Sequence, residues 1–186
     1  MVGFGRLRRN LQVQIYLRAR LYELFERSSR KSGLDIRRTY SEDRGDGFIL
    51  AVPPDVPTEQ LIHPFLEYVR AGLRLHNQVS NELAQLRLRI AVHCGEVQTD
   101  EHGLVGDSVT HLCRLLEAPS FKRVTRESGA YLAVIASSTV YEEILWHAPG
   151  LIDPDDYAKI DVKHKELSGS GWVRLVGRAM PYDKPA

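Results

Sequence analysis

Several classes of protein are excluded by what this sequence lacks. No apolar run approaches the roughly 18 residues that a membrane-spanning helix requires. The formal net charge is only +1, so the chain has no surplus of positive charge to attract nucleic acid or a membrane surface. The start also lacks a secretory signal, because arginines follow the first five residues directly. We therefore expect a cytoplasmic protein that binds neither nucleic acid nor a membrane.

Cysteine and aromatic residues are scarce as well. The two cysteines, Cys94 and Cys113, show no metal-binding spacing, and we expect both thiols to be reduced. The seven histidines show no ligand spacing either, and His93 is expected to have a structural role at a strand end. Aromatic residues make up 8% of the chain and do not follow the predicted strands. This argues against an RNA-binding ferredoxin-like sheet, whose strands carry stacking aromatics.

Hydrophobic periodicity is what the sequence does provide, and it predicts an α+β fold in a single domain over residues 1–186. Helical spacing over 10–32 ends at Gly33, and the Gly45-Asp46-Gly47 turn between two apolar strands predicts a hairpin. We expect helices on one face of a mainly antiparallel sheet. Strands are predicted over 35–41, 47–52, 86–93, 131–135, 159–164 and 171–176, with a hairpin arm over about 95–105, and further helices from 58 to 73, from 109 to 116 with an end near Pro119, and from 138 to 145.

This order of elements approaches a ferredoxin-like βαββαβ arrangement, with one exception. Such an arrangement begins with a strand, whereas only Met1 to Phe4 precede the first predicted helix. The first strand of that topology is central in the sheet. We therefore expect two strands of this chain to lack their middle partner.

Three stretches of the sequence carry recognisable motifs in a fixed order. They are Met1-Val2-Gly3-Phe4-Gly5, then Glu42-Asp43-Arg44-Gly45-Asp46, and finally residues 90–97 (IAVHCGEV) with 103–116 (GLVGDSVTHLCRLL). Their order, spacing and residue types resemble the class III nucleotidyl cyclase catalytic domain of the adenylate and guanylate cyclases. The resemblance extends from residue 1 to about 176, and it implies a ferredoxin-like fold derived from the βαββαβ arrangement.

The resemblance implies a reaction and its cofactors. The ribose 3′-oxygen of a nucleoside triphosphate attacks the α-phosphate, and pyrophosphate leaves with formation of a 3′,5′-cyclic nucleotide. Two Mg²⁺ or Mn²⁺ ions, held by two aspartates, activate the oxygen and offset the phosphate charge. Asp46 matches the second aspartate, while the first would fall one position before Met1. We therefore expect weak or no cyclase activity from this chain: either the true start lies upstream or the domain is degenerate, and the missing central strand favours the first.

Other positions take their expected roles from the same resemblance. Arg114 matches the arginine that stabilises the transition state, and Thr110 stands where the family usually has an asparagine that orients the ribose. Lys165, in preference to Lys163, matches the lysine of a late strand that binds the triphosphate. The backbone N–H groups of Gly3, Phe4 and Gly5 are expected to bind phosphate at the start of the first helix.

Base recognition and assembly complete the set of expectations. Glu42 stands at the first base-reading position, and Gly103 stands at the second, where it offers no side chain. The purine pattern is thus incomplete, which is compatible with the pyrimidine cyclases of bacterial antiviral systems. The resemblance implies a head-to-tail homodimer in which one chain supplies Asp46 and its partner supplies Thr110 and Arg114. The alternative is a domain without catalysis that serves for dimerisation or nucleotide sensing.

Overall fold

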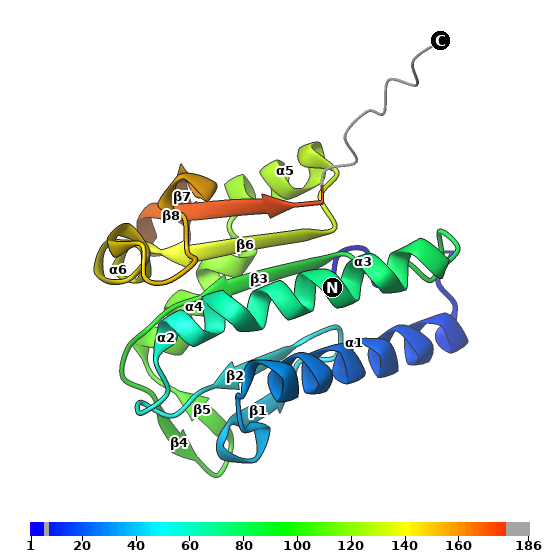
Figure 1. The fold of residues 1–186 in the computed structure, drawn as a ribbon, viewed down its shortest axis with the longest axis horizontal. Coiled ribbons are helices and arrows are strands. Elements are labelled where there is room, and N and C mark those ends of the chain that lie inside the picture. The colour runs from blue at the N-terminus through cyan, green and yellow to red at the C-terminus, as the bar shows by residue number, and fades with distance from the viewer. Residues whose placement is uncertain (6–7, 178–186) are drawn as a thin grey trace.

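A computed structural model describes residues 1–5 and 8–177 of the chain (Figure 1). The predicted α+β class is confirmed: a mixed four-stranded sheet is accompanied by two separate hairpins. No helix among the described residues is both long and apolar enough to cross a membrane. The helices are α1 (Leu11–Ser32), α2 (Thr58–Gln60), α3 (Leu66–Val79), α4 (Asp107–Glu117), α5 (Pro119–Ser128) and α6 (Ser138–Glu143), and the strands are β1 (Tyr40–Asp43), β2 (Phe48–Ala51), β3 (Leu88–Val92), β4 (Gln98–Asp100), β5 (Gly103–Val105), β6 (Leu132–Ser137), β7 (Ala158–His164) and β8 (Leu167–Val176).

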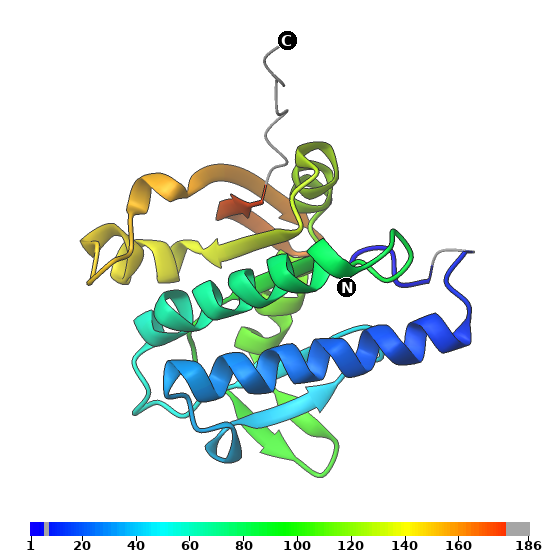
Figure 2. The same cartoon turned by 45° about the vertical axis from the view of Figure 1, so that its right-hand side comes forward.

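The first helix forms as its sequence predicts, and both of its ends have a local cause. The side chain of Asn10 accepts a hydrogen bond from the Val13 N–H at 3.1 Å, which caps the first turn. Gly33 ends the helix in the left-handed region at φ 75°, a conformation that glycine adopts without steric cost. Leu17 and Leu21 are buried, and α1 packs beside α3 (Figure 2).

The central sheet has the strand order β3-β6-β8-β7. The pair β3–β6 is parallel, with Leu88 opposite Leu132, whereas β6–β8 and β7–β8 are antiparallel. Every residue of β6 is buried, from Leu132 to Ser137. Its first five residues, Leu132 to Ala136, are all apolar, as expected of a strand whose two faces both lack contact with water.

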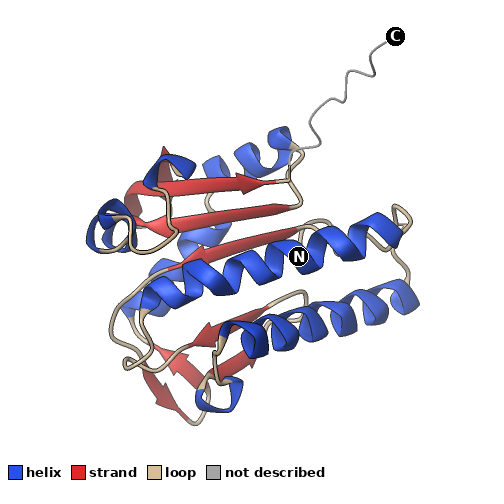
Figure 3. Cartoon of the chain, viewed as in Figure 1, coloured by secondary structure: helices blue, strands red, loops and turns tan. Residues whose placement is uncertain are grey.

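Helices cover both faces of this sheet, so the expected arrangement on one face is wrong. Side chains alternate along β6, and Val134 packs into the cluster that contains α1 and α3. Its neighbour Ile135 packs instead with Leu115 of α4 and Phe121 of α5. Figure 3 shows the strands between the helices of these two layers. Of the two helices in this second layer, the sequence predicts α4 but not α5, because Pro119 is typical of a helix end as well as of a helix start.

Proline residues account for two further differences from the predicted elements. The sequence predicts a helix end near Pro119, yet Pro119 is the first residue of α5, where the missing N–H of proline costs nothing. The helix predicted from 58 to 73 is interrupted at Pro64, so that α3 begins only at Leu66. The region from 95 to 105 does not pair with β3, since β4 and β5 form a hairpin of their own.

The β1–β2 hairpin is separate from the four-stranded sheet. Within residues 1–5 and 8–177, β2 pairs only with β1, and β3 pairs only with β6. One edge of β2 and one edge of β3 therefore have no strand beside them. This agrees with the expectation that two strands lack their middle partner.

Candidate functional site

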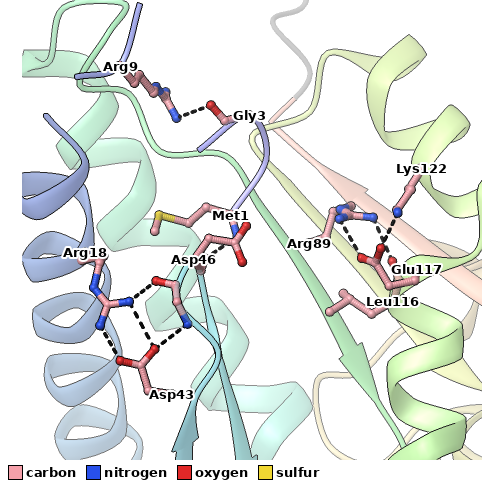
Figure 4. A network of polar contacts seen from close by, with 11 residues as sticks. Met1, Gly3, Arg9, Arg18, Asp43, Asp46, Arg89, Leu116, Glu117 and Lys122 are labelled. Carbon is pink, nitrogen blue, oxygen red and sulfur yellow. Dashed lines mark hydrogen bonds and ion pairs between the residues drawn. The ribbon is translucent and has the colours of Figure 1, made fainter. Parts of the chain in front are cut away.

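The turn that carries Asp46 is built by its own neighbours. Gly45 lies at φ 83°, in the left-handed region, and its N–H donates to Asp43 Oδ1 at 2.6 Å. Arg18 of α1 pairs with the Asp43 carboxylate and also donates to the Gly45 carbonyl oxygen (Figure 4). The hydrogen bond from Arg18 is the main reason why the pKa of Asp43 falls to about 2. Asp43 thus holds the turn, and Asp46 remains half exposed at its tip.

The amino group of Met1 contacts Asp46. Its nitrogen donates to the Asp46 carbonyl oxygen at 2.6 Å and lies 3.4 Å from Oδ2 of the same residue. Burial lowers the pKa of this amino group, and the charge of Asp46 opposes that shift in part. Met1 is therefore in direct contact with the turn that carries Asp46.

The described residues do not form a resident metal site. Among them, no group of three or more histidine, cysteine, aspartate or glutamate side chains is arranged to hold an ion. The nearby Asp43 is engaged by Arg18, so Asp46 is the carboxylate left to meet a cation at this turn. One carboxylate suits a divalent ion that arrives with phosphate oxygens, since Mg²⁺ binds readily to one or two carboxylates plus substrate phosphates.

The two positions predicted to read the base lie in contact. Glu42 Oε2 accepts a hydrogen bond from the Leu104 N–H at 3.2 Å, and Arg44 lies 2.6 Å from Oε1. Gly103 has φ 128°, and a Cβ atom at this position would lie 2.5 Å from Glu42 Oε2. The carboxylate of Glu42 therefore fills the space that a side chain at position 103 would need. This contact places β5 beside the hairpin that carries Asp46.

The predicted phosphate-binding glycines do not lie at a helix start. Gly3, Phe4 and Gly5 form a turn well ahead of α1, whose first turn is capped by Asn10. The carbonyl oxygen of Gly3 accepts a hydrogen bond from Arg9 at 3.2 Å. The expected placement at the helix start is thus wrong, because the helix begins at its side-chain cap several residues later.

A second group of predicted residues gathers around α4 and the turn between β7 and β8. Arg114 pairs with Glu166 of this turn at 2.5 Å. Lys165 precedes Glu166 and lies in the turn at φ 54°, so its expected position on a strand is wrong. Thr110 lies one helical turn before Arg114, and its hydroxyl donates to the Gly106 carbonyl oxygen at 3.3 Å. Arg114, Thr110 and Lys165 therefore occupy one neighbourhood.

Two stacked histidines connect β3 to α4. The rings of His93 and His111 lie 4.4 Å apart between centroids, and His93 Nδ1 lies 2.9 Å from the Ser137 hydroxyl oxygen. That oxygen also caps α6 by accepting from the Val140 N–H, so His93 is connected to the start of α6. Burial lowers the pKa of both histidines; a further contribution comes from His111 for His93 and from Arg114 for His111.

We expect stability to fall as pH decreases through the range in which free histidine titrates. Both folded-state pKa values are depressed, so the unfolded chain gains protons first once pH drops below about 6.5. The free energy of unfolding, measured by denaturant titration, should decrease from pH 7.5 to 5.5. A His111→Gln variant should show a shallower dependence over the same interval. Equal slopes for the two proteins would contradict the assignment.

Comparison with known proteins adds no family to this description: no family model matches the chain, and neither does any curated protein. The argument about function therefore depends on the residues themselves. Sequence reasoning missed Arg18 and Glu166, which hold the Asp46 turn and Arg114. No local signal identifies either partner, because each contact joins segments that are far apart in the chain.

Proposed function

We propose that this chain is a class III nucleotidyl cyclase-like domain that binds a nucleoside triphosphate between two copies arranged head to tail. The observation that carries the proposal is the grouping of the predicted residues. Glu42, Gly103 and Asp46 belong to one pair of hairpins, while Arg114, Thr110 and Lys165 gather at α4 and the β7–β8 turn. Each group is half of a site, and a second copy supplies the other half.

The chemistry of each half suits a different part of the ligand. The guanidinium of Arg114 and the ammonium of Lys165 suit phosphate oxygens, and Thr110 offers a hydroxyl for the ribose. Asp46 suits the divalent ion that accompanies a triphosphate, and Glu42 with Gly103 suits the base. In the implied reaction, the 3′-oxygen loses its proton and bonds to the α-phosphorus while the bond to pyrophosphate breaks. Bound Mg²⁺ or Mn²⁺ would activate that oxygen and neutralise phosphate charge.

A second candidate function is nucleotide binding without turnover, in a dimerisation or sensing module. The ligands around Asp46 favour it, because no group of three or more histidine, cysteine, aspartate or glutamate side chains among the described residues is arranged to hold an ion, whereas the reaction would need two. The two candidates share the binding step and differ only in product. Incubation with each of the four triphosphates and Mn²⁺, followed by chromatography, separates them: cyclic nucleotide supports the cyclase, and bound but unchanged triphosphate supports the module.

Mixing two inactive variants tests the shared sites. Arg114→Ala should weaken triphosphate binding by about 10- to 100-fold, because a charge-assisted contact to phosphate is lost. Asp46→Ala should remove the part of the affinity that depends on Mn²⁺. In an equal mixture, half of the dimers pair the two variants and one of their two sites is intact. Calorimetric titration should therefore recover about a quarter of the tight sites.

The control for this mixture is Arg126→Ala, an exposed arginine on α5 that belongs to neither half. It should bind triphosphate as the parent chain does. A mixture that recovers no tight sites would show that Asp46 and Arg114 do not combine between chains. Absence of triphosphate binding by the parent chain, with and without Mn²⁺, would overturn the proposed function itself.

A further inference from the structure

The tip of the β7–β8 hairpin places a carboxylate on the guanidinium of Arg114. The last residue pair of this ladder is His164 with Leu167, so Lys165 and Glu166 are the two residues of the turn. Glu166 Oε2 lies 2.5 Å from Arg114 Nη2 on α4. The arginine that is proposed to bind phosphate is therefore already paired in the free chain.

The two side chains of this ion pair differ in their exposure. The Arg114 side chain is 28% exposed, whereas that of Glu166 is 75% exposed. The guanidinium is thus partly covered by its surroundings, while the carboxylate lies mostly in solvent. Within residues 1–5 and 8–177, Glu166 is the one residue that forms an ion pair with Arg114. A ligand that displaces Glu166 therefore meets a guanidinium with no second ion pair to break.

The backbone of the turn is constrained by the strands on either side of it. The β7–β8 ladder continues up to His164 and Leu167, and between them Lys165 adopts φ 54°, in the left-handed region that favours glycine. Release of Arg114 therefore requires rotation of the Glu166 side chain and no movement of the hairpin. Because exposed side chains change rotamer within nanoseconds, this release is fast.

Glu166 also changes the charge that this neighbourhood presents to a ligand. Its neighbour Lys165 is exposed and forms no ion pair with another described residue. Of the two cations, Lys165 and Arg114, only the second is neutralised by a carboxylate. A phosphate group at Arg114 would lie within hydrogen-bond distance of the same guanidinium and would repel the Glu166 carboxylate. The two anions therefore compete for one cation.

We propose that Glu166 is an intramolecular competitor of phosphate: its carboxylate occupies Arg114 in the free chain, and a triphosphate must displace it to bind. This inference rests on the proposed function and adds a regulatory contact to the same site. The apparent affinity for triphosphate is then the intrinsic affinity reduced by the fraction of chains in which Arg114 is free. Because exposed ion pairs are weak, the reduction should be about two- to fivefold.

Triphosphate binding by a Glu166→Gln variant tests this competition. The substitution keeps the size of the side chain and removes its charge. Calorimetric titration in the presence of Mn²⁺ should show that the variant binds a nucleoside triphosphate, and inorganic triphosphate as well, about two- to fivefold more tightly than the parent chain. The same substitution in an Arg114→Ala background should change the affinity by less than about 1.5-fold, because no guanidinium is left to release.

The matched control is Glu127→Gln, which removes one carboxylate from the exposed surface of α5. Glu127 forms no ion pair with another described residue, so its loss changes the net charge equally and frees no arginine. This control should bind triphosphate as the parent chain does. A gain in affinity for the control equal to that of Glu166→Gln would overturn the proposal, because net charge alone would then explain both.

The reactivity of Arg114 tests the contact without any nucleotide. Phenylglyoxal modifies the guanidinium of arginine, and mass spectrometry of the digested protein measures the rate at Arg114. Modification of Arg114 should be about two- to fivefold faster in Glu166→Gln than in the parent chain or in Glu127→Gln. Equal rates in the three proteins would overturn the proposal, since Glu166 would then not occupy Arg114 in solution.

The binding results separate a failure of this inference from a failure of the proposed function. Equal or weaker binding of nucleoside triphosphate by Glu166→Gln would overturn the competition alone, and weaker binding would show that Glu166 orients Arg114 for phosphate. An equal gain in the Arg114→Ala background would also overturn it, because Glu166 would then repel phosphate without holding Arg114. Tighter binding of inorganic triphosphate only would keep the competition and overturn the proposed function. Absence of all triphosphate binding would overturn both.

Discussion

Replacing Phe121 with alanine is expected to lower the free energy of unfolding by about 3–5 kcal/mol. Phe121 is fully buried on α5, where it packs with Leu115, Ile135 and Val173 between the helices and the sheet. The substitution removes the apolar contacts of the ring and leaves a cavity. The hydrogen-bonded strands of the sheet cannot move in to fill this cavity. Urea titration monitored by circular dichroism measures the loss.

The control for this substitution is Lys122→Ala, the adjacent position on the same helix. Lys122 is exposed and pairs with Glu117 at the surface, so its loss should cost less than about 1 kcal/mol. Both variants replace a large side chain with alanine in α5, and only one opens the core. A Phe121→Ala variant within 1 kcal/mol of the parent chain would show that α5 does not close the second face of the sheet.

The elements that could be predicted from sequence are those with local causes. Helix α1 combines apolar spacing with a capping asparagine and a terminal glycine, and all three signals lie within its own span. The hairpin around Asp46 similarly follows from its two glycines, of which Gly45 adopts a positive φ. The local signal is ambiguous at Pro119, because proline is common both just after one helix and at the first position of the next.

The candidate site was predictable only in its residue types. The contact of Glu42 with Gly103 and the pairing of Arg114 with Glu166 join segments separated by many residues, so no periodicity reports them. Arg18 belongs to a basic N-terminal face that the sequence predicts to be solvated or to contact a partner, yet it fixes the turn beside Asp46. The unpaired edges of β2 and β3 likewise become visible only when the pairing of the described strands is known.

The second large effect is expected at Glu67, which joins α3 to β8. Glu67 Oε1 accepts from Arg174 at 2.8 Å, and Oε2 accepts from Arg70 at 2.6 Å. Glu67 and Arg174 are both partly buried, so Glu67→Ala leaves a half-buried guanidinium whose remaining ion-pair partner among the described residues is Asp156. We expect the free energy of unfolding to fall by about 2–3 kcal/mol, as is usual when one partner of a charged hydrogen bond is removed.

The pH dependence distinguishes a loss of charge from a loss of packing. Burial opposes ionisation of Glu67, but the hydrogen bonds and charges of Arg70 and Arg174 outweigh it and lower its pKa. The stabilisation should therefore be complete above about pH 4.3 and decline as pH falls through the depressed value. Glu67→Gln keeps the shape of the side chain and should flatten the decline of the free energy of unfolding at acid pH. A double variant, Glu67→Leu with Arg174→Met, should be more stable than Glu67→Ala. If the glutamine variant retains the full acid dependence, another carboxylate must titrate over this pH range. That result would show that the ionised Glu67–Arg174 pair does not link α3 to β8.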